Sequence, residues 1–155
     1  MDAQERGHDL AATMTLLCVW ALIAAGCVAP APSFGAYEGK AAASAASSLS
    51  AARTGTLAAR TAARHRLFGP YVSVVLEQAE GDATSVAAQF SSIQPPDGRS
   101  DQLRAALQPL LDRAAGLLAL MRIEARRGGR GALVAVAARL DAVAASLERF
   151  AEAHS

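Results

Sequence analysis

Three clusters of helix-breaking residues divide most of the chain into four segments of similar length. They are Gly69-Pro70, Pro95-Pro96-Asp97-Gly98 and Gly128-Gly129-Arg130-Gly131. Such clusters end helices, because glycine adopts left-handed backbone conformations and proline lacks the amide hydrogen that a helix interior needs. The chain has no asparagine and is rich in alanine, the best helix former. The pattern predicts an all-α chain with helices over about 37–68, 70–94, 100–127 and 131–154.

Apolar residues recur at alternating spacings of four and three in each segment, a pattern typical of helices that lie nearly parallel to one another. The pattern continues through Gly81 and Pro109, so we expect an unbroken second helix and a third helix that bends at the proline. Ser100 is placed to cap the third helix. Short connections make sequential helices antiparallel, and the sequence therefore predicts an up-down-up-down four-helix bundle over residues 37–155.

The first segment has the smallest core-facing side chains, because only Leu49 among its regularly spaced positions is large. Burial of a leucine side chain contributes about 1.5 to 3 kcal/mol, and burial of an alanine contributes much less. We therefore expect this helix to fray first. The alternative is a three-helix bundle of residues 70–154 with an alanine-rich arm.

Residues 10–29 form an uncharged, mostly apolar run, followed by a spacer of proline, alanine and serine. A run of about 20 such residues can cross a bilayer as a helix, or serve as the core of a secretion signal. Its end, Ile23-Ala24-Ala25-Gly26-Cys27, resembles the lipobox of bacterial lipoproteins, in which the cysteine is acylated and becomes the new N-terminus. The resemblance implies a signal peptide over 1–27, a spacer over 28–36, and attachment to membrane lipid through Cys27 on the extracytoplasmic face of the cell membrane.

Other arrangements of this hydrophobic N-terminal helix stay open. Asp2, Glu5 and Asp9 outweigh Arg6 ahead of the apolar run, whereas positive charge normally marks the cytoplasmic flank. This balance favours an uncleaved single-pass anchor with a cytoplasmic bundle. Cleavage without lipidation would give a secreted protein, and a buried hairpin helix would belong to a soluble one.

The motifs of several common catalytic and cofactor sites are missing from the four segments. They contain no Glu-x-x-His pair, no Gly-x-Ser-x-Gly and no cysteine, the groups on which di-iron bundles, many hydrolases and thiol enzymes depend. The net charge of +1 is too small to imply nucleic-acid binding. We therefore predict no metal, no cofactor and no enzymatic activity, and an interaction or envelope role with an unidentified protein partner. The alternative is a small-ligand carrier that binds between helices near Ala52, Thr56 and Ala59.

Two groups of arginines are candidate contact residues. Arg53 and Arg60 share one face of the first helix, where they are either solvated or in contact with anionic lipid headgroups. Arg126, Arg127 and Arg130 flank the sequence GGRG, which lacks the Lys-Ser/Thr of a phosphate-binding loop and therefore indicates a turn. These three side chains are candidates for holding an anion at that turn.

The segments SSIQPPDGRSDQLR at 91–104 and LMRIEARRGG at 120–129 carry a second resemblance. With the rest of the run from Phe68 to Ser155, they look like small uncharacterised lipoproteins and secreted helical proteins of high-GC Gram-positive bacteria. The resemblance implies export and lipid attachment. It carries over no functional residues.

Overall fold

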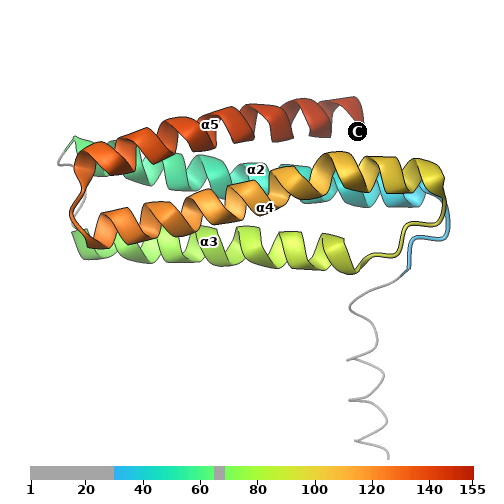
Figure 1. Ribbon diagram of the computed structural model, residues 1–155, viewed down its shortest axis with the longest axis horizontal. Helices are drawn as coiled ribbons and strands as arrows, with labels where there is room; N and C mark the ends of the chain where they lie inside the picture. Colours follow the sequence, from blue (N-terminus) through green and yellow to red (C-terminus); the bar gives the residue numbers. More distant parts are fainter. Residues whose placement is uncertain (1–29, 65–68) are drawn as a thin grey trace, which may run out of the picture. The chain divides into compact units, whose positions relative to one another are not determined.

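The computed structural model describes residues 30–64 and 69–155, which form four helices. The helices are α2 (Phe34–Ala63), α3 (Gly69–Ser92), α4 (Gly98–Arg126) and α5 (Arg130–Ala153) (Figure 1). The described residues contain no strand, so the prediction of an all-α four-helix bundle is confirmed. The expected signal peptide or anchor helix, Cys27 and the first residues of the spacer lie outside the described residues.

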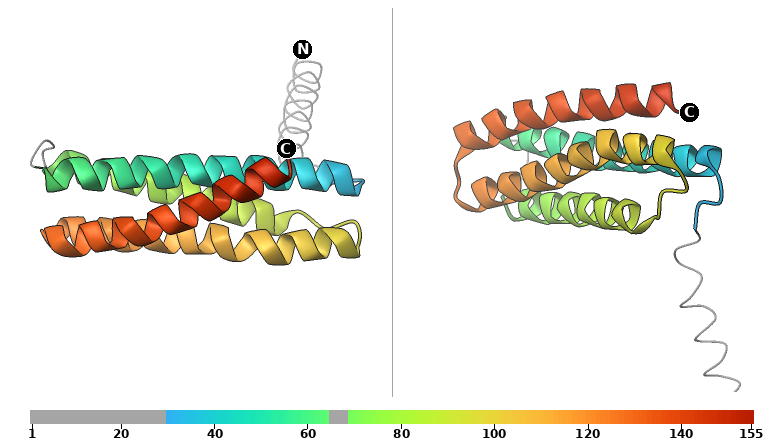
Figure 2. Two further views of the ribbon diagram at one scale, coloured as in Figure 1. Left: turned by 90° about the horizontal axis from the view of Figure 1, so that it is seen from above. Right: turned by 45° about the vertical axis from the view of Figure 1, so that its right-hand side comes forward.

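Consecutive helices run in opposite directions. In Figure 1 the colours of α2 and α4 advance one way along the bundle, and those of α3 and α5 advance the other way. α2 and α4 each contact the other three helices, and they contact each other diagonally across the bundle, whereas the backbones of α3 and α5 lie apart on opposite sides of the described bundle (Figure 2). α2 and α4 are thus the central pair of the bundle.

The close approach of α2 to α4 follows from the small side chains of α2. Its buried residues are Tyr37, Ala41, Ala45, Ser48, Leu49, Ala51, Ala52, Gly55, Thr56, Ala58 and Ala59. The distance between packed helices depends on the side chains at their contact, and small ones allow a close approach. At Gly55 an added Cβ would lie less than 3.0 Å from Leu118 Cδ2 of α4. The first helix is therefore packed into the bundle and is no loose arm, while its early fraying stays a prediction.

Larger side chains from the other helices fill the space around α2. The fully buried ones include Leu76 and Phe90 of α3, Leu107, Leu111, Leu118 and Met121 of α4, and Leu140 and Leu147 of α5. At the start of α2, Tyr37 packs against Phe90 with the ring centroids 5.6 Å apart. Ala31 is also buried. The chain therefore joins the core before residue 37, and α2 begins at Phe34, inside the expected spacer.

Asp97, and not Ser100, caps the start of α4. Asp97 Oδ1 accepts hydrogen bonds from the backbone N–H of Ser100 over 2.8 Å and from Ser100 Oγ over 2.7 Å. The two bonds from Ser100 favour the ionised carboxylate and lower the pKa of Asp97. The prediction of Ser100 as the cap is wrong, because the aspartate ahead of it accepts the free backbone amide and the serine hydroxyl becomes a donor.

Gly81 and Pro109 act as the sequence suggests, whereas Gly69 and Pro70 do not end the first helix: α2 ends at Ala63, and these two residues begin α3. α3 continues through Gly81 and α4 continues through Pro109, and the ribbon of α4 changes direction along its length (Figure 1). Gly128 has a φ of 71°, a left-handed conformation that glycine adopts without a steric penalty. Gly128 and Gly129 therefore lie in the turn between α4 and α5, and Arg130 and Gly131 of the GGRG sequence begin α5.

Candidate functional site

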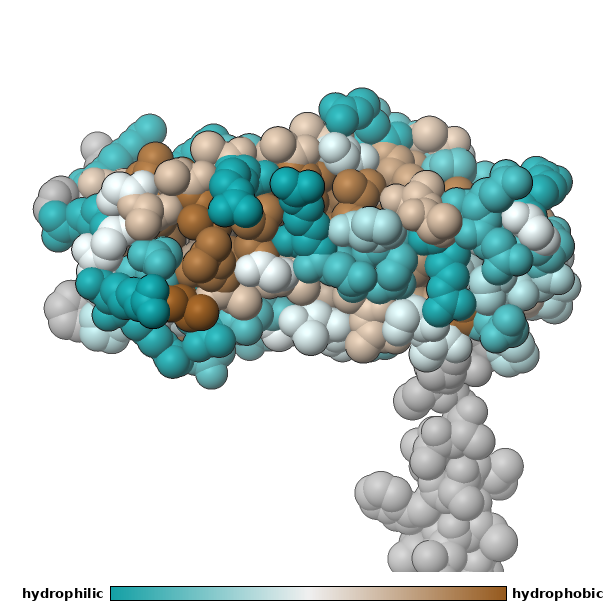
Figure 3. All heavy atoms as spheres, in the orientation of Figure 1, coloured by the Kyte–Doolittle hydropathy of each residue, from teal (hydrophilic) through white to brown (hydrophobic). Residues whose placement is uncertain are grey.

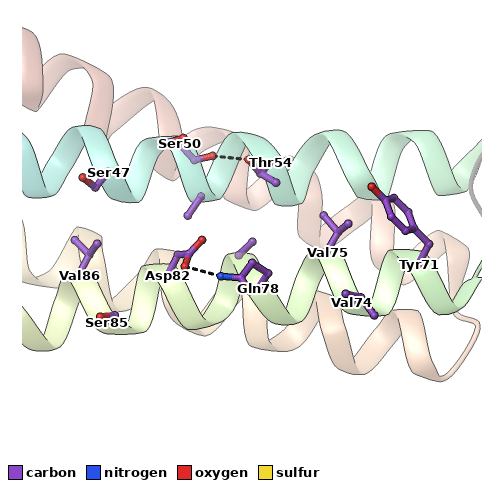
Figure 4. Close-up of a pocket in the computed structure, with 12 residues that line it drawn as sticks. Ser47, Ser50, Thr54, Tyr71, Val74, Val75, Gln78, Asp82, Ser85 and Val86 are labelled. Atoms are coloured by element: carbon purple, nitrogen blue, oxygen red, sulfur yellow. Dashed lines mark hydrogen bonds between the residues drawn. The ribbon is translucent and has the colours of Figure 1, made fainter.

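An open groove of about 770 Å³ runs between α2 and α3. Figure 4 shows short side chains along its α2 wall, and valines with Tyr71 along its α3 wall. The lining residues are Ser47, Ser50, Ala51 and Thr54 of α2, and Tyr71, Val74, Val75, Gln78, Ala79, Asp82, Ser85 and Val86 of α3. The groove exists because the α2 side chains along it are too short to fill the space beside α3.

Two pairs of polar residues in the groove are bonded along their own helix. Thr54 Oγ1 donates to the carbonyl oxygen of Ser50 over 3.0 Å, and Gln78 Nε2 donates to Asp82 Oδ1 over 2.9 Å (Figure 4). Bonds of this kind orient the side chains without bridging the two helices. Because neither bond crosses the groove, the apolar side chains that line it remain accessible.

Three large apolar side chains are exposed on this side of the bundle. Tyr71 and Val74 of the groove are 58% and 63% exposed, and Leu57 of α2 is 68% exposed. Leu57 lines a neighbouring hollow of about 300 Å³, which shares Ser50 and Thr54 with the groove. The two hollows form one continuous surface. We call it the α2–α3 face, defined by Ala46, Ser50, Thr54 and Leu57 of α2 and Tyr71, Val74 and Asp82 of α3.

Asp82 is the charged residue that α3 contributes to this surface. Glu77, Glu80 and Asp82 are the charged residues of α3, and the helix has no basic residue. Glu80 is hydrogen-bonded to Arg122 of α4, and this bond raises the pKa of the guanidinium. Among the described residues no basic side chain forms an ion pair with Asp82. The α2–α3 face therefore presents a carboxylate whose hydrogen-bond partner is the Gln78 amide.

Arg53 and Arg60, the candidates for membrane contact, bridge α2 to α5. Arg53 Nη2 lies 2.5 Å from Glu148 Oε1, and Arg60 Nη2 lies 2.5 Å from Asp141 Oδ2. The two arginine side chains remain 58% and 60% exposed. Exposed pairs of this kind contribute roughly 0 to 1 kcal/mol each, so their main effect is to favour one register of α2 against α5. Contact of these arginines with lipid stays a prediction.

Arg126, Arg127 and Arg130, the arginines at the turn between α4 and α5, have carboxylates close by. Arg126 Nη2 lies 3.6 Å from Glu77 Oε2, and Arg127 Nη1 lies 3.4 Å from Glu124 Oε1. Arg130 lines a hollow of about 250 Å³ together with Glu124. The carboxylate of Glu124 would repel an anion in that hollow. The structure thus surrounds the candidate anion contact with acidic groups of the chain itself.

The space suggested for a small ligand is occupied by packing. Ala52, Thr56 and Ala59 are all buried, and Leu118 packs against the same helix at Gly55. None of these three residues lines the groove between α2 and α3. Thr56 Oγ1 is nonetheless a buried hydroxyl oxygen that has no hydrogen-bond partner in the described structure.

The sequence analysis missed the α2–α3 face. The signal for it is present as apolar residues that fall outside the four-three pattern: Leu57, Tyr71 and Val74. Single exposed apolar residues are common on protein surfaces, and only a contiguous group indicates an interaction site. Their grouping depends on how α2 and α3 pack, which the local pattern does not show.

A second apolar area lies on the face of the bundle that Figure 3 shows. Hydrophobic residues gather there towards the end at which α4 meets α5, with charged residues among them. Apart from the α2–α3 face, the large exposed apolar side chains are Ile123 of α4 and Val134 of α5 in the described part of the chain, at 38% and 45%. Both are less exposed than the three residues of the α2–α3 face. We therefore take the α2–α3 face as the candidate site.

No helix in the described part of the chain combines the length and the apolar character needed to span a membrane. Within residues 30–64 and 69–155, no group of three His, Cys, Asp or Glu side chains is arranged to hold a metal ion.

Comparison of the chain with protein-family models, with curated proteins and with solved structures found no match.

Proposed function

We propose that this protein is a lipid-anchored, extracytoplasmic helical bundle with a non-enzymatic role in protein interaction or in the cell envelope. The anchor part of the proposal is supported by the apolar run of residues 10–29 and its lipobox-like end at Cys27. The interaction part is supported by the α2–α3 face, on which Leu57, Tyr71 and Val74 are more than half exposed around an open groove. Exposed apolar side chains grouped in this way typically mark a binding surface.

The length of chain between Cys27 and the bundle fits a short tether. Three residues separate Cys27 from Ala31, whose side chain is already buried in the bundle. At about 3.6 Å per residue, this connection extends over at most about 14 Å. Pro30 and Pro32 restrict the backbone where it meets the bundle. An acylated Cys27 would therefore keep the bundle close to the membrane surface and its binding face available to other membrane-bound molecules.

Metabolic labelling tests the anchor directly. Cells that express the full chain are grown with an alkyne analogue of palmitate, and the purified protein is assayed for the label. We expect label on the wild type and on Cys18→Ala, and loss of label on Cys27→Ala. Mass spectrometry of the native N-terminus should find a lipidated Cys27. An unlabelled wild type, or label that survives Cys27→Ala, would refute the anchor.

Protease accessibility separates this proposal from the inverted anchor. In spheroplasts of the expressing cells, added protease should digest the bundle before the cells are lysed. A bundle that resists protease until lysis would indicate the single-pass arrangement with a cytoplasmic bundle. A cytoplasmic protein of the same cells serves as the control for intact membranes.

The groove also favours a second candidate, a carrier of a small apolar ligand. Its volume of about 770 Å³ falls within the usual range of ligand sites, roughly 300 to 1,000 Å³. Native mass spectrometry of the purified protein tests this function. A carrier should retain a small molecule that is lost in Val74→Arg, whereas a protein-binding surface should retain none.

A further inference from the structure

We infer that the α2–α3 face binds a second copy of this chain in a twofold-symmetric dimer, with the symmetry axis close to Ser50 and Thr54. The inference deepens the interaction role proposed above and does not depend on the lipid. In such a dimer the same patch contributes from both copies, so it must be complementary to itself. Three properties of the face meet this requirement: its shape, its exposed side chains and its charges.

The shape allows two α2 helices to approach closely. Ala46, Ser50 and Thr54 follow one another at intervals of four residues, and therefore lie on one side of α2. Residues four positions apart form ridges and grooves that interlock with those of a facing helix. Because these side chains are small, the backbones of two copies can come close together at this point. The same small residues leave the hollows beside Leu57 and Val74 open.

In the dimer, the exposed side chains of one copy contact the second copy across the twofold axis. In an antiparallel pair of α2 helices centred between Ser50 and Thr54, Leu57 of one copy comes opposite Ser47 of the other, next to Ala46. Ser47 lines the groove and Ala46 lines the neighbouring hollow, so Leu57 meets the second copy where the two hollows adjoin. The contact would bury Leu57 from both copies. Val74 and Tyr71, farther out on α3, would cover the edges of the interface.

The charges are complementary in the same arrangement. Asp82 lies beside Ser50 across the groove, with its carboxylate directed towards α2 (Figure 4). The antiparallel pairing brings Arg53 of the second copy opposite residue 51, which is close to this carboxylate. The side chain of Arg53 is 58% exposed while it contacts Glu148, and a guanidinium has five N–H donors, enough for two carboxylates. Each dimer would contain this Asp82–Arg53 contact twice.

Photo-crosslinking of the full chain in cells tests the dimer. Two copies with different tags are co-expressed, each with a photoreactive phenylalanine analogue in place of Leu57. The matched control carries the analogue in place of Ala138, an exposed residue of α5. We expect light-dependent crosslinks between the two tags at Leu57 and none at Ala138. Crosslinks at Leu57 only to another protein or to lipid, or no crosslinks at all, would overturn the inference.

A charge exchange tests the predicted register. Asp82→Arg and Arg53→Glu should each abolish the crosslink when only one variant is expressed, because each places like charges opposite each other. Co-expression of the two variants should restore it, since the mixed dimer has one exchanged and one native contact. Loss without restoration would overturn the arrangement. Both positions are exposed, and an unchanged melting temperature of each purified variant would show that the loss is not caused by unfolding.

The lipid anchor and the dimer can fail independently. Cys27→Ala removes the acylation site and leaves the α2–α3 face intact, so it should lose the palmitate label and retain the Leu57 crosslink. Label without the crosslink would refute the dimer and leave the anchor standing.

Discussion

Replacing Gly55 with alanine introduces a methyl group into the contact between α2 and α4. The new Cβ would lie less than 3.0 Å from Leu118 Cδ2, with Leu140 Cδ2 and Leu76 Cδ2 each 3.7 Å away. Leu118 is fully buried, so it has no solvent-facing rotamer into which it can retreat. The helices must move apart, or Leu118 must adopt a strained conformation. The substitution therefore tests whether α2 and α4 approach closely because the side chains of α2 are small.

The expected change is a balance of two effects. An extra methyl group in a well-packed core costs about 1 to 3 kcal/mol. Against this, alanine is favoured over glycine in a helix interior by about 1 kcal/mol. With an approach this close we expect the upper end of the cost, and a net loss of about 2 kcal/mol for Gly55→Ala. For a domain of this size, about 4 °C per kcal/mol corresponds to a melting temperature lower by about 8 °C.

Gly81→Ala is the matched control. Gly81 also lies inside a helix, but nothing would contact its added Cβ within 4 Å. This variant should gain the helix propensity alone, about 1 kcal/mol. Thermal and urea unfolding, followed by circular dichroism, compare the two variants under identical conditions. Equal stabilisation by both substitutions would refute the close packing at Gly55.

A double-mutant cycle identifies the contact. Leu118→Ala alone should cost about 2 to 5 kcal/mol, because it leaves a cavity in the core. In that background Gly55→Ala no longer meets the leucine methyl group, and it should become neutral or stabilising. The two substitutions should therefore show a coupling energy above about 1 kcal/mol. Additive effects would indicate that Leu118 is not the residue that limits the approach.

Three further predictions concern single groups. Thr56 Oγ1 is buried without a partner, so Thr56→Val should stabilise the bundle by about 1 kcal/mol in thermal unfolding, and a lower melting temperature would indicate that the hydroxyl is bonded. The lowered pKa of Asp97 means that its carboxylate stabilises the fold above the unfolded pKa of about 4, and that this stabilisation is lost as the pH falls through the lower folded value. Asp97→Asn should therefore flatten the decrease of melting temperature in acid, and an unchanged slope would contradict the cap. Arg104 donates to the carbonyl oxygens of Ser91 and Ile93 at the end of α3, so Arg104→Ala should cost about 1 kcal/mol in urea unfolding, and no change would show that water replaces these bonds.

Local sequence signals were sufficient to identify the four helices. Alanine content, breaker clusters and the four-three pattern act over a few residues, so they can be recognised without knowing the fold. The same signals indicated that α4 would continue through Pro109 and that GGRG would be a turn. They were wrong about Ser100, because Asp97 three residues earlier is also a capping residue, and only the structure shows which of the two accepts the free backbone amide.

The roles of the arginines could not be predicted from the sequence. Arg53 and Arg60 were recognised as sharing a face, and the structure confirms this by pairing both with α5. Their partners lie more than eighty positions away in the chain, so no local pattern could identify them. The two arginines, which the sequence showed only as a cationic face of one helix, are thus part of the contact between α2 and α5.

The sequence by itself determined that α2 is a helix with small core-facing side chains, because helix propensity and spacing are local properties. Only the tertiary structure decided what those side chains do. Side-chain size taken alone favoured α2 as the most weakly held helix. In the bundle the same alanines and Gly55 let α4 approach, and α2 contacts all three neighbours. On its other side, the short side chains leave a groove beside α3. Burial energy depends on what lies opposite a residue, and that is fixed only when distant segments pack together.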